Sequence, residues 1–360
     1  MSDCKKENNN KKLFINGAGG RIGRMVTYEI TRILDEEWIG GINDPIGIDR
    51  LVESLYEKDF VHGKYDWQID KIDNHTIKIN EHKIPVFSEK DVLKIPLKDL
   101  DIYCVEECSG FYGDPKGVKS PAKEQCLARP FIGNGAKRVI LSYPADSADI
   151  TLIAGVNLDE YDPEKHYIIS NASCTTKALA SPLQLLMDCG IHIRALLMDT
   201  VHAATNSQRI LESLNQIWTH TTGAAKATGL VIKSLKGKMD GLSYRVPTVD
   251  GSFANIYFIG EFDGELDESK INNMFLEHYK DERYMGRIGI IDKKDVGTLN
   301  DVVGRRENGI VILSKTRVFP LPYVGERGKS YFVQIVSAYD NEAAPPVDQV
   351  IVTKYIANLD

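Results

Sequence analysis

The sequence predicts an α/β protein whose first half forms a doubly wound, mainly parallel β-sheet. Two observations carry this prediction. Short apolar runs typical of buried strands alternate with helical or loop segments, and the first run leads directly into a glycine-rich turn. The 360 residues are enough for two domains that each bury a core. A content of 42% hydrophobic and 26% charged residues excludes a mainly disordered or fibrous chain.

The first helix is expected directly after the glycine turn, between two short strands. Residues 13–15 form the first strand, and Ile22, Val26 and Ile30 then recur at the spacing of one helix face. Strands are predicted at 13–15, 38–42, 77–79, 102–105, 139–141, 152–156, 167–170 and 194–202, with a further helix at 175–187. Such alternation favours parallel pairing of the strands.

The glycine turn, residues 16–24 (NGAGGRIGR), predicts a dinucleotide-binding site. Its candidate residues are Gly17, Gly20, Arg21, Ile22 and Gly23. They stand at the start of the first helix, where free N–H groups attract a pyrophosphate. Asp44 lies 21 residues after Gly23, where a carboxylate can accept hydrogen bonds from an adenosine ribose.

This turn departs by one residue from the usual G-x-G-x-x-G pattern. Aligned on Gly20 and Gly23, the first glycine position falls on Ala18; alternatively, Gly17 and Gly19 serve with one extra residue. A glycine run alone can also be a tight turn that binds nothing. The flanking strands and the acidic residue that follows favour the binding site.

Cys174 is the candidate nucleophile. It stands in N-A-S-C-T-T, residues 171–176, between a predicted strand and the helix at 175–187. At a helix N-terminus the free N–H groups and the macrodipole favour a thiolate over a thiol. Most cysteines are buried and inert, but the hydroxyl neighbours Ser173 and Thr175 would be unusual in a dry core.

A thiolate nucleophile needs a nearby base or imidazolium, and His202 is the candidate. A helix over 175–187 rises about 20 Å and the strand over 194–202 returns about 26 Å, so the strand ends at the level of Cys174. The alternative is an ordinary core or surface histidine. The geometry, together with the polar residues that follow, favours the catalytic interpretation.

Hydroxyl groups, a glycine and one arginine follow along the chain, and these are groups that bind phosphate oxygens. The candidates for this role are Ser173, Thr175, Thr205, Thr222, Gly223 and Arg245. Each alone is generic, but together they predict one or two anion sites beside the thiol. The sequence predicts no metal site.

Charge and composition limit the partners and the compartment. The net charge of −7 argues against nucleic acid as the main partner, and no apolar run approaches the roughly 18 residues of a membrane span. The polar head, residues 1–12, lacks the apolar stretch of a signal peptide and is expected to be disordered. The six cysteines form no C-x-x-C pair, which fits a reducing compartment. We therefore expect a cytoplasmic protein.

Motifs along almost the whole chain resemble those of the phosphorylating glyceraldehyde-3-phosphate dehydrogenases. They are I-N-G-x-G-G-R-I-G-R at 15–24, I-N-D-P at 42–45, V-H-G-K at 61–64, G-A-K-R-V-I at 135–140, G-V-N at 155–157, S-N-A-S-C-T-T at 170–176, T-V-H-A at 200–203, T-G-A-A-K-A at 222–227, R-V-P-T at 245–248 and S-A-Y-D-N-E at 337–342. The resemblance implies a divergent member of this family.

The resemblance also implies the domain organisation and the assembly. A Rossmann-type doubly wound domain would bind NAD. It would comprise residues 13–173 and also residues 340–360, because a C-terminal helix returns to it. An α+β catalytic domain would span 174–339. The resemblance further implies that the protein is a homo-oligomer, either a dimer or a tetramer. The partners implied are a phosphorylated aldehyde and inorganic phosphate.

The mechanism implied by the resemblance uses the residues identified above. Cys174 would attack the aldehyde to form a thiohemiacetal, and His202 would take the hydroxyl proton as a hydride leaves for the nicotinamide. Inorganic phosphate would then release an acyl phosphate from the thioester. Asn341 would orient the nicotinamide amide, and Ser142 would lie close to that ring.

The anion-binding residues divide into two groups by the same resemblance. Those for inorganic phosphate would be Ser173, Thr175, Thr222 and Gly223, and those for the phosphate of the substrate would be Thr205 and Arg245.

Several positions depart from the family pattern. Lys177 replaces a usual asparagine, and Ser207 stands where an acidic residue is typical. Only 16 residues separate Thr205 from Thr222, where the family has a longer loop that carries an arginine and reaches a neighbouring subunit. Substrate recognition and assembly are therefore expected to differ from the family norm.

Three functions remain open at this point. The first is the oxidation of glyceraldehyde 3-phosphate, and the second is the same chemistry on a different anionic aldehyde. The third is a catalytically idle paralogue that binds NAD or a protein partner. The retention of both Cys174 and His202 argues against the third.

Overall fold

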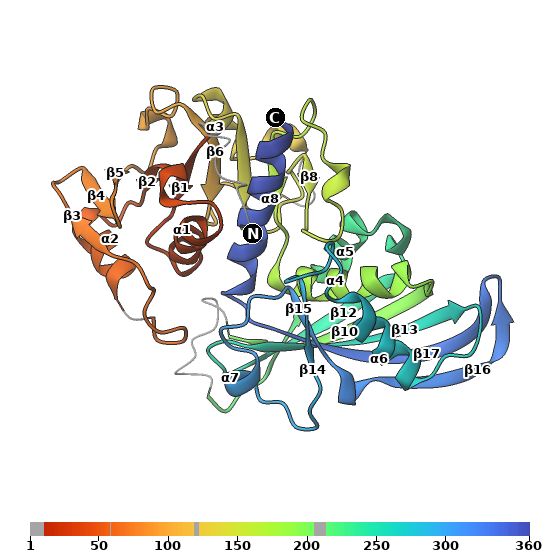
Figure 1. Ribbon diagram of the computed structural model, residues 1–360. Coiled ribbons are helices and arrows are strands. Elements are labelled where there is room, and N and C mark those ends of the chain that lie inside the picture. Colours follow the sequence, from red (N-terminus) through yellow and green to blue (C-terminus); the bar gives the residue numbers. More distant parts are fainter. Residues whose placement is uncertain (1–10, 58, 119–121, 205–213) are drawn as a thin grey trace, which may run out of the picture.

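The computed structural model describes residues 11–57, 59–118, 122–204 and 214–360, and they form two β-sheets with helices packed against them (Figure 1). The helices are α1 (Arg21–Ile33), α2 (Ile48–Tyr56), α3 (Arg129–Gly133), α4 (Cys174–Asp188), α5 (Ala224–Val231), α6 (Glu268–His278), α7 (Thr298–Asp301) and α8 (Ala344–Leu359). Within the described part of the chain, no helix is both long enough and apolar enough to cross a bilayer.

The first sheet lies in the order β3-β4-β5-β2-β1-β6-β7-β9-β8. Its strands are β1 (Lys12–Asn16), β2 (Ile39–Asn43), β3 (Ile69–Lys71), β4 (Thr76–Ile79), β5 (His82–Phe87), β6 (Ile102–Glu107), β7 (Arg138–Leu141), β8 (Ile150–Thr151) and β9 (Ile168–Ser170). Every pair from β5 to β8 is parallel, whereas β3, β4 and β5 pair antiparallel at one edge. The predicted doubly wound, mainly parallel sheet is confirmed.

Helices cover both faces of this sheet because alternate residues of each strand point to opposite sides. Leu13 and Ile15 of β1 pack into one core, which they share with Val26 of α1 and residues of α8. Phe14, between them, packs into a second core with Phe131 of α3. The chain therefore winds over both faces, as an α/β sheet requires.

The second sheet is mostly antiparallel and lies in the order β11-β12-β10-β13-β17-β15-β14, with β16 paired to β17. Its strands are β10 (His192–Ala203), β11 (Trp218–Thr221), β12 (Met239–Val246), β13 (Ser252–Phe262), β14 (Ile288–Ile291), β15 (Gly309–Ile312), β16 (Arg317–Gly325) and β17 (Gly328–Tyr339). Leu179 and Leu183 of α4 and Phe275 of α6 share one core with Ile256 and Val333 of the sheet. This α+β arrangement agrees with the expected fold class.

Helix α8 follows the last strand of the second sheet but packs with α1 of the first (Figure 1). Buried Glu106 of β6 anchors it, since its two oxygens accept hydrogen bonds from Gln349 Nε2 and Thr353 Oγ1, each at 2.6 Å. Burial raises the pKa of Glu106 to about 7 against the opposing effect of these two bonds. At the end of α8, Asp360 accepts hydrogen bonds from Tyr103 and Tyr161.

Two local expectations differ from the structure. A strand was expected at 152–156, but β8 ends at Thr151 and the following residues form a turn. Asn157 closes this turn by bonding Ile153 N and Thr151 O through its side chain, and Gly155 adopts φ +79°. Lys12, assigned to the disordered head, belongs to β1; residues 1–10 lie outside the described residues.

We expect Thr353→Val to lower the free energy of unfolding by about 1.5–3 kcal/mol, because it removes a hydrogen bond to a buried carboxylate. Thr31→Val is the matched control, since Thr31 of α1 is half-buried and bonds only the carbonyl of Tyr28 one turn earlier. Its effect is expected to stay within about 0.5 kcal/mol. Urea unfolding of both variants measures the difference. Equal losses would show that this bond does not hold α8 in place.

Candidate active site

A cavity of about 720 Å³ opens at the carboxyl edge of the first sheet, above the glycine turn. Gly17 has φ +83°, and a Cβ there would lie 2.8 Å from the Ser109 backbone. A Cβ on Gly23 would lie 2.0 Å from Gly17 O, so only glycine fits at both positions. Gly20 is the N-cap of α1, whose free N–H groups point out of the helix start. The turn thus brings bare backbone to the cavity wall.

Asp44 lies in the wall of this cavity, directly after β2. Its Oδ2 accepts the N–H of Gly19 at 2.8 Å and its Oδ1 accepts that of Ile46 at 3.1 Å. A Cβ on Gly19 would lie 2.9 Å from Asp44 Oδ2 and 2.5 Å from Ile46 Cδ1. The extra glycine of the turn therefore makes room for the acidic residue. Because glycine backbone, a helix N-terminus and a carboxylate line one cavity, these residues fit a dinucleotide.

Three of the candidate cofactor residues have other neighbours. Arg21 pairs with Glu342 at 2.5 Å, and Ile22 packs against the core beneath α1. Ser142 follows β7 and donates its N–H to the carbonyl of Glu107, and it lies outside the lining of the cavity. The sequence analysis did not identify four lining residues that follow β6, namely Cys108, Ser109, Phe111 and Tyr112.

Cys174 is the first residue of α4, and a strained turn puts it there. Ala172 has φ +57°, a left-handed conformation that costs a non-glycine residue about 1–2 kcal/mol. Ser173 then caps the helix, since its Oγ accepts the N–H of Thr176 at 3.1 Å. The thiol is thereby held at the positive end of a 15-residue helix.

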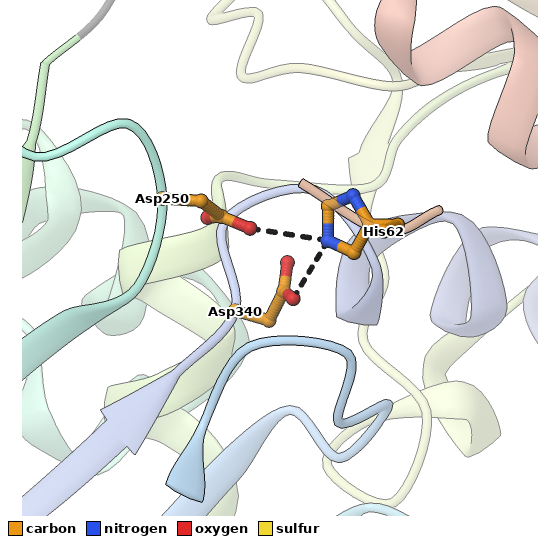
Figure 2. A group of neighbouring side chains, drawn as sticks. All are labelled: His62, Asp250 and Asp340. Atoms are coloured by element: carbon orange, nitrogen blue, oxygen red, sulfur yellow. Dashed lines mark hydrogen bonds and ion pairs between the residues drawn. The ribbon is translucent and has the colours of Figure 1, made fainter. Parts of the chain in front are cut away.

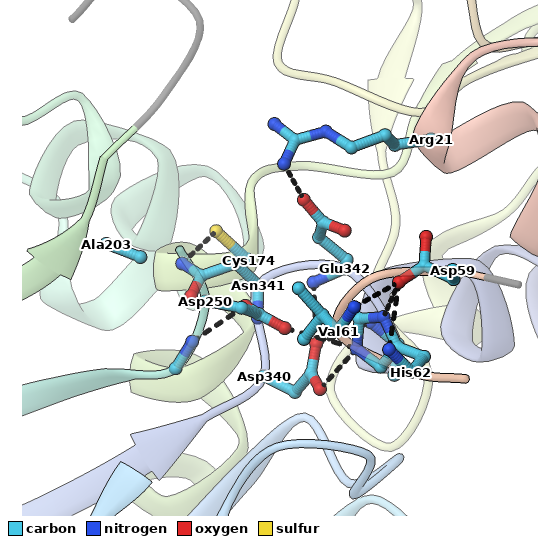
Figure 3. A network of polar contacts seen from close by, with 12 residues as sticks. Arg21, Asp59, Val61, His62, Cys174, Ala203, Asp250, Asp340, Asn341 and Glu342 are labelled. Carbon is cyan, nitrogen blue, oxygen red and sulfur yellow. Dashed lines mark hydrogen bonds and ion pairs between the residues drawn. The ribbon is translucent and has the colours of Figure 1, made fainter. Parts of the chain in front are cut away.

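The thiol contacts the ring of His202 and the side-chain amide of Asn341, and Figure 3 shows the second of these contacts. Cys174 Sγ lies 3.6 Å from His202 Nε2, and His202 stands near the end of β10 and is buried. Asn341 Nδ2 lies 3.7 Å from the same sulfur and 3.2 Å from His202 Nε2. His202 Nδ1 lies 2.8 Å from Ala203 O, an acceptor, and also contacts Arg245 Nη1, a donor, so these two neighbours favour opposite protonation states of Nδ1. Nε2 faces both the sulfur and the amide nitrogen of Asn341.

The surroundings of Cys174 favour its thiolate. Burial by itself raises the pKa of the thiol, but hydrogen bonds and charge from His202, an N–H of Asn341 and the charge of Lys177 together lower it below its usual value. Lys177 is buried one turn along α4, where its Nζ donates to Asn171 O. A lowered thiol pKa and an adjacent histidine are the features of a candidate nucleophile.

A second cavity, of about 500 Å³, opens beside the thiol. The predicted residues in its lining are Ser173, Cys174, Thr175, His202, Thr222, Gly223 and Arg245. Arg245 of β12 lies opposite His202 in the strand register and contacts both its Nδ1 and Ala203 O. Thr205 and Ser207 lie outside the described residues. Hydroxyls, a helix start and an arginine around one cavity form a site suited to an anion.

Sequence reasoning missed two residues of this site. Tyr339 is buried, and its hydroxyl contacts Thr175 Oγ1 at 2.9 Å and Thr200 Oγ1 at 2.8 Å. Burial raises its pKa, so it stays a neutral donor. Lys226 of α5 lines the cavity and pairs with Asp146 at 2.6 Å. Both belong to quoted motifs, S-A-Y-D-N-E and T-G-A-A-K-A, which were the available signals.

One group of side chains in the described part of the chain has the composition of a metal site. His62, Asp250 and Asp340 each offer a ligand atom, and these atoms lie within 4.8 Å of one another. The sequence analysis predicted no metal and did not single out this group. It lies apart from the lining of both cavities.

Comparison with known proteins identifies the family. Residues 11–115 match the glyceraldehyde 3-phosphate dehydrogenase NAD binding domain, and residues 173–341 match the C-terminal domain of the same family. The chain is 33% identical over 355 residues to glyceraldehyde-3-phosphate dehydrogenase of Streptomyces coelicolor, covering 96% of this chain and 98% of that protein. It is also 33% identical over 342 residues to glyceraldehyde-3-phosphate dehydrogenase 2 of Bacillus subtilis, covering 92% of each. The matched NAD binding domain makes NAD the cofactor. The chain therefore belongs to the glyceraldehyde-3-phosphate dehydrogenase family of oxidoreductases.

Proposed function

We propose that this protein catalyses the NAD-dependent, phosphorylating oxidation of a phosphorylated aldehyde, glyceraldehyde 3-phosphate or a similar compound, through a thioester on Cys174. The observation that carries this proposal is the contact of Cys174 Sγ with His202 Nε2, 3.6 Å apart, at a helix start beside an anion-binding cavity. The relatives named above are glyceraldehyde-3-phosphate dehydrogenases, which supports the same reaction.

The proposed first half of the reaction uses the thiol and the histidine. The Cys174 thiolate adds to the aldehyde carbon, and the oxyanion that forms lies by the N–H of Cys174 and by His202. A protonated His202 Nε2 first gives its proton to this oxyanion. It then takes the same hydroxyl proton back as a general base while the substrate carbon loses a hydride, so that a thioester remains on the sulfur. Bound NAD supplies the hydride acceptor for this oxidation.

In the proposed second half, inorganic phosphate attacks the thioester carbonyl and the thiolate leaves, which produces an acyl phosphate. We assign Ser173, Thr175, Thr222 and Gly223 to inorganic phosphate, and Arg245 with Thr205 to the phosphate of the substrate. Thr175 Oγ1 is oriented by Tyr339, and Ser173 remains within the cavity lining while it caps α4. The hydroxyls of Thr175 and Ser173 are thus held by neighbours before an anion arrives.

NAD would be held by the glycine turn and Asp44, with Asn341 near the thiol to orient the nicotinamide. Gly17, Gly20 and Gly23 would hold the pyrophosphate together with the backbone N–H groups of Arg21 and Ile22, and Ser142 would lie near the nicotinamide. We further propose a homo-oligomer, a dimer or a tetramer, on the grounds of family membership alone.

A different anionic aldehyde is the second candidate substrate, and one observation favours it. Arg245 turns toward His202 Nδ1 and Ala203 O, and the single arginine between Thr205 and Thr222 is Arg209, in the segment outside the described residues. A substrate phosphate that lacks one charge-assisted contact loses about 1.5–3 kcal/mol, a factor of roughly 10 to 150 in affinity.

Steady-state NADH formation with a panel of phosphorylated aldehydes, with and without inorganic phosphate, tests the proposal. We expect turnover to require phosphate, because only phosphate releases the acyl group efficiently from Cys174. Phosphate-independent turnover at full rate would contradict the phosphorylating reaction. A best rate with glyceraldehyde 3-phosphate at ordinary family efficiency would remove the second candidate.

Cys174→Ala is expected to abolish NADH formation while NAD still binds, since Cys174 is the proposed nucleophile. Cys189→Ala, at the other end of α4, is the matched control and is expected to retain activity. His202→Asn is expected to slow NADH formation by about 10²–10⁴-fold and to move the pH midpoint of Cys174 alkylation upward. Appreciable turnover by purified Cys174→Ala, or an unchanged alkylation profile in His202→Asn, would remove these assignments.

The protein is expected to prefer NAD over NADP, because the Asp44 carboxylate accepts from ribose hydroxyls and repels a 2′-phosphate. Asp44→Ala should weaken NAD binding by about 10- to 150-fold, which is the factor for a lost charge-assisted hydrogen bond. It should also reduce the preference for NAD over NADP. Asp49→Ala, an exposed carboxylate at the start of α2, serves as the control. Fluorescence titration of both cofactors provides the measurement, and equal kcat/KM for NAD and NADP in the unmodified protein would disprove the role of Asp44.

A further inference from the structure

A buried ionic cluster of three side chains connects the part of the chain that follows α2 with two segments that adjoin strands of the second sheet (Figure 2). His62 comes from the segment between α2 and β3, Asp250 from the turn between β12 and β13, and Asp340 follows β17 directly. His62 Nε2 lies 2.9 Å from Asp340 Oδ2 and 3.1 Å from Asp250 Oδ2. The side chains of both aspartates are fully buried, and that of His62 is 7% exposed.

Two carboxylates therefore face one ring nitrogen, and this favours a positive charge on His62. Burial lowers the pKa of His62, but Asp250 and Asp340 raise it to about 10. Its other nitrogen, Nδ1, lies 3.3 Å from Asp59 Oδ1, and Asp59 pairs with Arg24 at 2.7 Å. At neutral pH the ring is an imidazolium that has a carboxylate on each side.

Asp250 has fewer hydrogen-bond donors at its Oδ2 than Asp340 has among the described residues. Its Oδ2 finds no hydrogen-bond donor with suitable geometry among the described residues, although His62 Nε2 lies close by. Asp340 Oδ2, by contrast, also accepts the N–H of Gly304 at 2.7 Å. Burial raises the pKa of Asp250, with the adjacent Asp340 adding to the effect. The charge of His62 is thus what keeps a second carboxylate in this position.

The same two carboxylates hold the backbone around Asn341 (Figure 3). Asp250 Oδ1 accepts the N–H of Asn341 at 2.9 Å, and Asp340 Oδ1 accepts those of Glu342 and Ala343 at 2.8 and 2.7 Å. Asn341 in turn extends Nδ2 toward Cys174 Sγ and His202 Nε2. A continuous chain of contacts therefore runs from His62 to the proposed nucleophile.

We propose that His62, Asp250 and Asp340 form an ionic clasp between the two sheets, and that Asp250 is a positioning residue that sets Asn341 against Cys174 and His202. This inference rests on the proposed function, because Asn341 matters only if Cys174 and His202 are the reacting pair. The clasp takes one residue from the side of the first sheet and two from the second. It thereby adds the buried charge of His62 to the contacts that place the cofactor site relative to the thiol.

A divalent cation is the competing occupant of the cluster. One imidazole nitrogen and two carboxylate oxygens are a reasonable ligand set for zinc or manganese. A ligating histidine must lose its proton from Nε2, however, and that proton lies between two carboxylates in the clasp. A metal ion and a proton therefore exclude each other at His62 Nε2, so experiment can separate the metal site from the ionic clasp.

The first test compares Asp250→Ala with Asp250→Asn. Alanine removes both the charge and the oxygen that accepts the Asn341 N–H, whereas asparagine keeps an oxygen for that bond. We expect Asp250→Ala to reduce both kcat and the rate of Cys174 alkylation in the absence of NAD by about 2- to 12-fold, the factor for one lost hydrogen bond of 0.5–1.5 kcal/mol. Asp250→Asn should recover most of this loss, and the KM for NAD should change less than kcat.

Glu261→Ala is the matched control for loss of a buried carboxylate. Glu261 is buried on β13, pairs with Arg194 at 3.5 Å and accepts the N–H of Arg327 at 3.1 Å, away from both cavities. The Glu261→Ala variant should leave the rate of Cys174 alkylation unchanged even if it lowers the melting temperature. Alkylation at the unmodified rate in folded Asp250→Ala would overturn the positioning role.

The second test follows melting temperature against pH. Because the folded pKa of His62 is raised, its stabilisation is complete below the unfolded value near 6.5 and is lost as pH rises through about 10. In Asp250→Asn the ring faces one carboxylate fewer, so the loss should occur roughly one pH unit lower. In His62→Gln the melting temperature should show no loss that corresponds to deprotonation of His62. The other charges around the ring, which all three proteins share, are Asp59, Arg24, Asp340, Glu342 and Arg21.

Identical pH curves for the unmodified protein and Asp250→Asn would overturn the clasp, and this outcome does not depend on catalysis. Turnover by Cys174→Ala would instead refute the proposed function while leaving the stability result intact. Titration with zinc chloride by calorimetry completes the design. Binding of one equivalent by the unmodified protein that disappears in His62→Gln would replace the clasp with a metal site, and no such binding is expected.

Discussion

The carboxylate of Asp348 is the contact on which the junction between the two sheets depends. This residue of α8 is fully buried, and its oxygens accept hydrogen bonds from Asn171 at 2.8 Å and Asn308 at 2.7 Å. Asn171 follows the first sheet and lies three residues before the thiol, whereas Asn308 lies directly before β15 of the second. A buried carboxylate is stable only when donors surround it, so these elements are held in one arrangement.

That arrangement explains why a buried cysteine can be a nucleophile. Burial alone would keep the sulfur protonated, whereas contacts from His202 and Asn341 together with the charge of Lys177 lower the pKa of the thiol. His202 belongs to β10, Asn341 follows β17 and Lys177 lies on α4, so these groups meet only when α4 is packed on the assembled second sheet. The strain at Ala172 is tolerated because the packed helix on one side and the sheet on the other leave the turn no alternative.

Sequence patterns were informative where the chemistry is local. Strand, glycine turn, helix and acidic residue follow one another within residues 13–44, so their order predicts a dinucleotide site at the start of the first helix. The start of α4 was predictable for the same reason, since Ser173 caps the helix that Cys174 begins. The expected strand at 152–156 was wrong because an apolar run does not distinguish a strand from a buried turn, and here the side chain of Asn157 closes the turn.

The sequence by itself determined the fold class, the family and the position of the thiol at a helix start, because each is written in contiguous residues. Only the tertiary structure decided which distant groups meet. Tyr339 reaches Thr175 across 164 positions of the chain, and His62 meets Asp340 across 278. The packing of α4 against β17 brings the first pair together, and the second pair meets where the segment after β17 reaches the segment after α2. Contacts of this kind carry no local pattern, since burial and charge pairing depend on the completed fold.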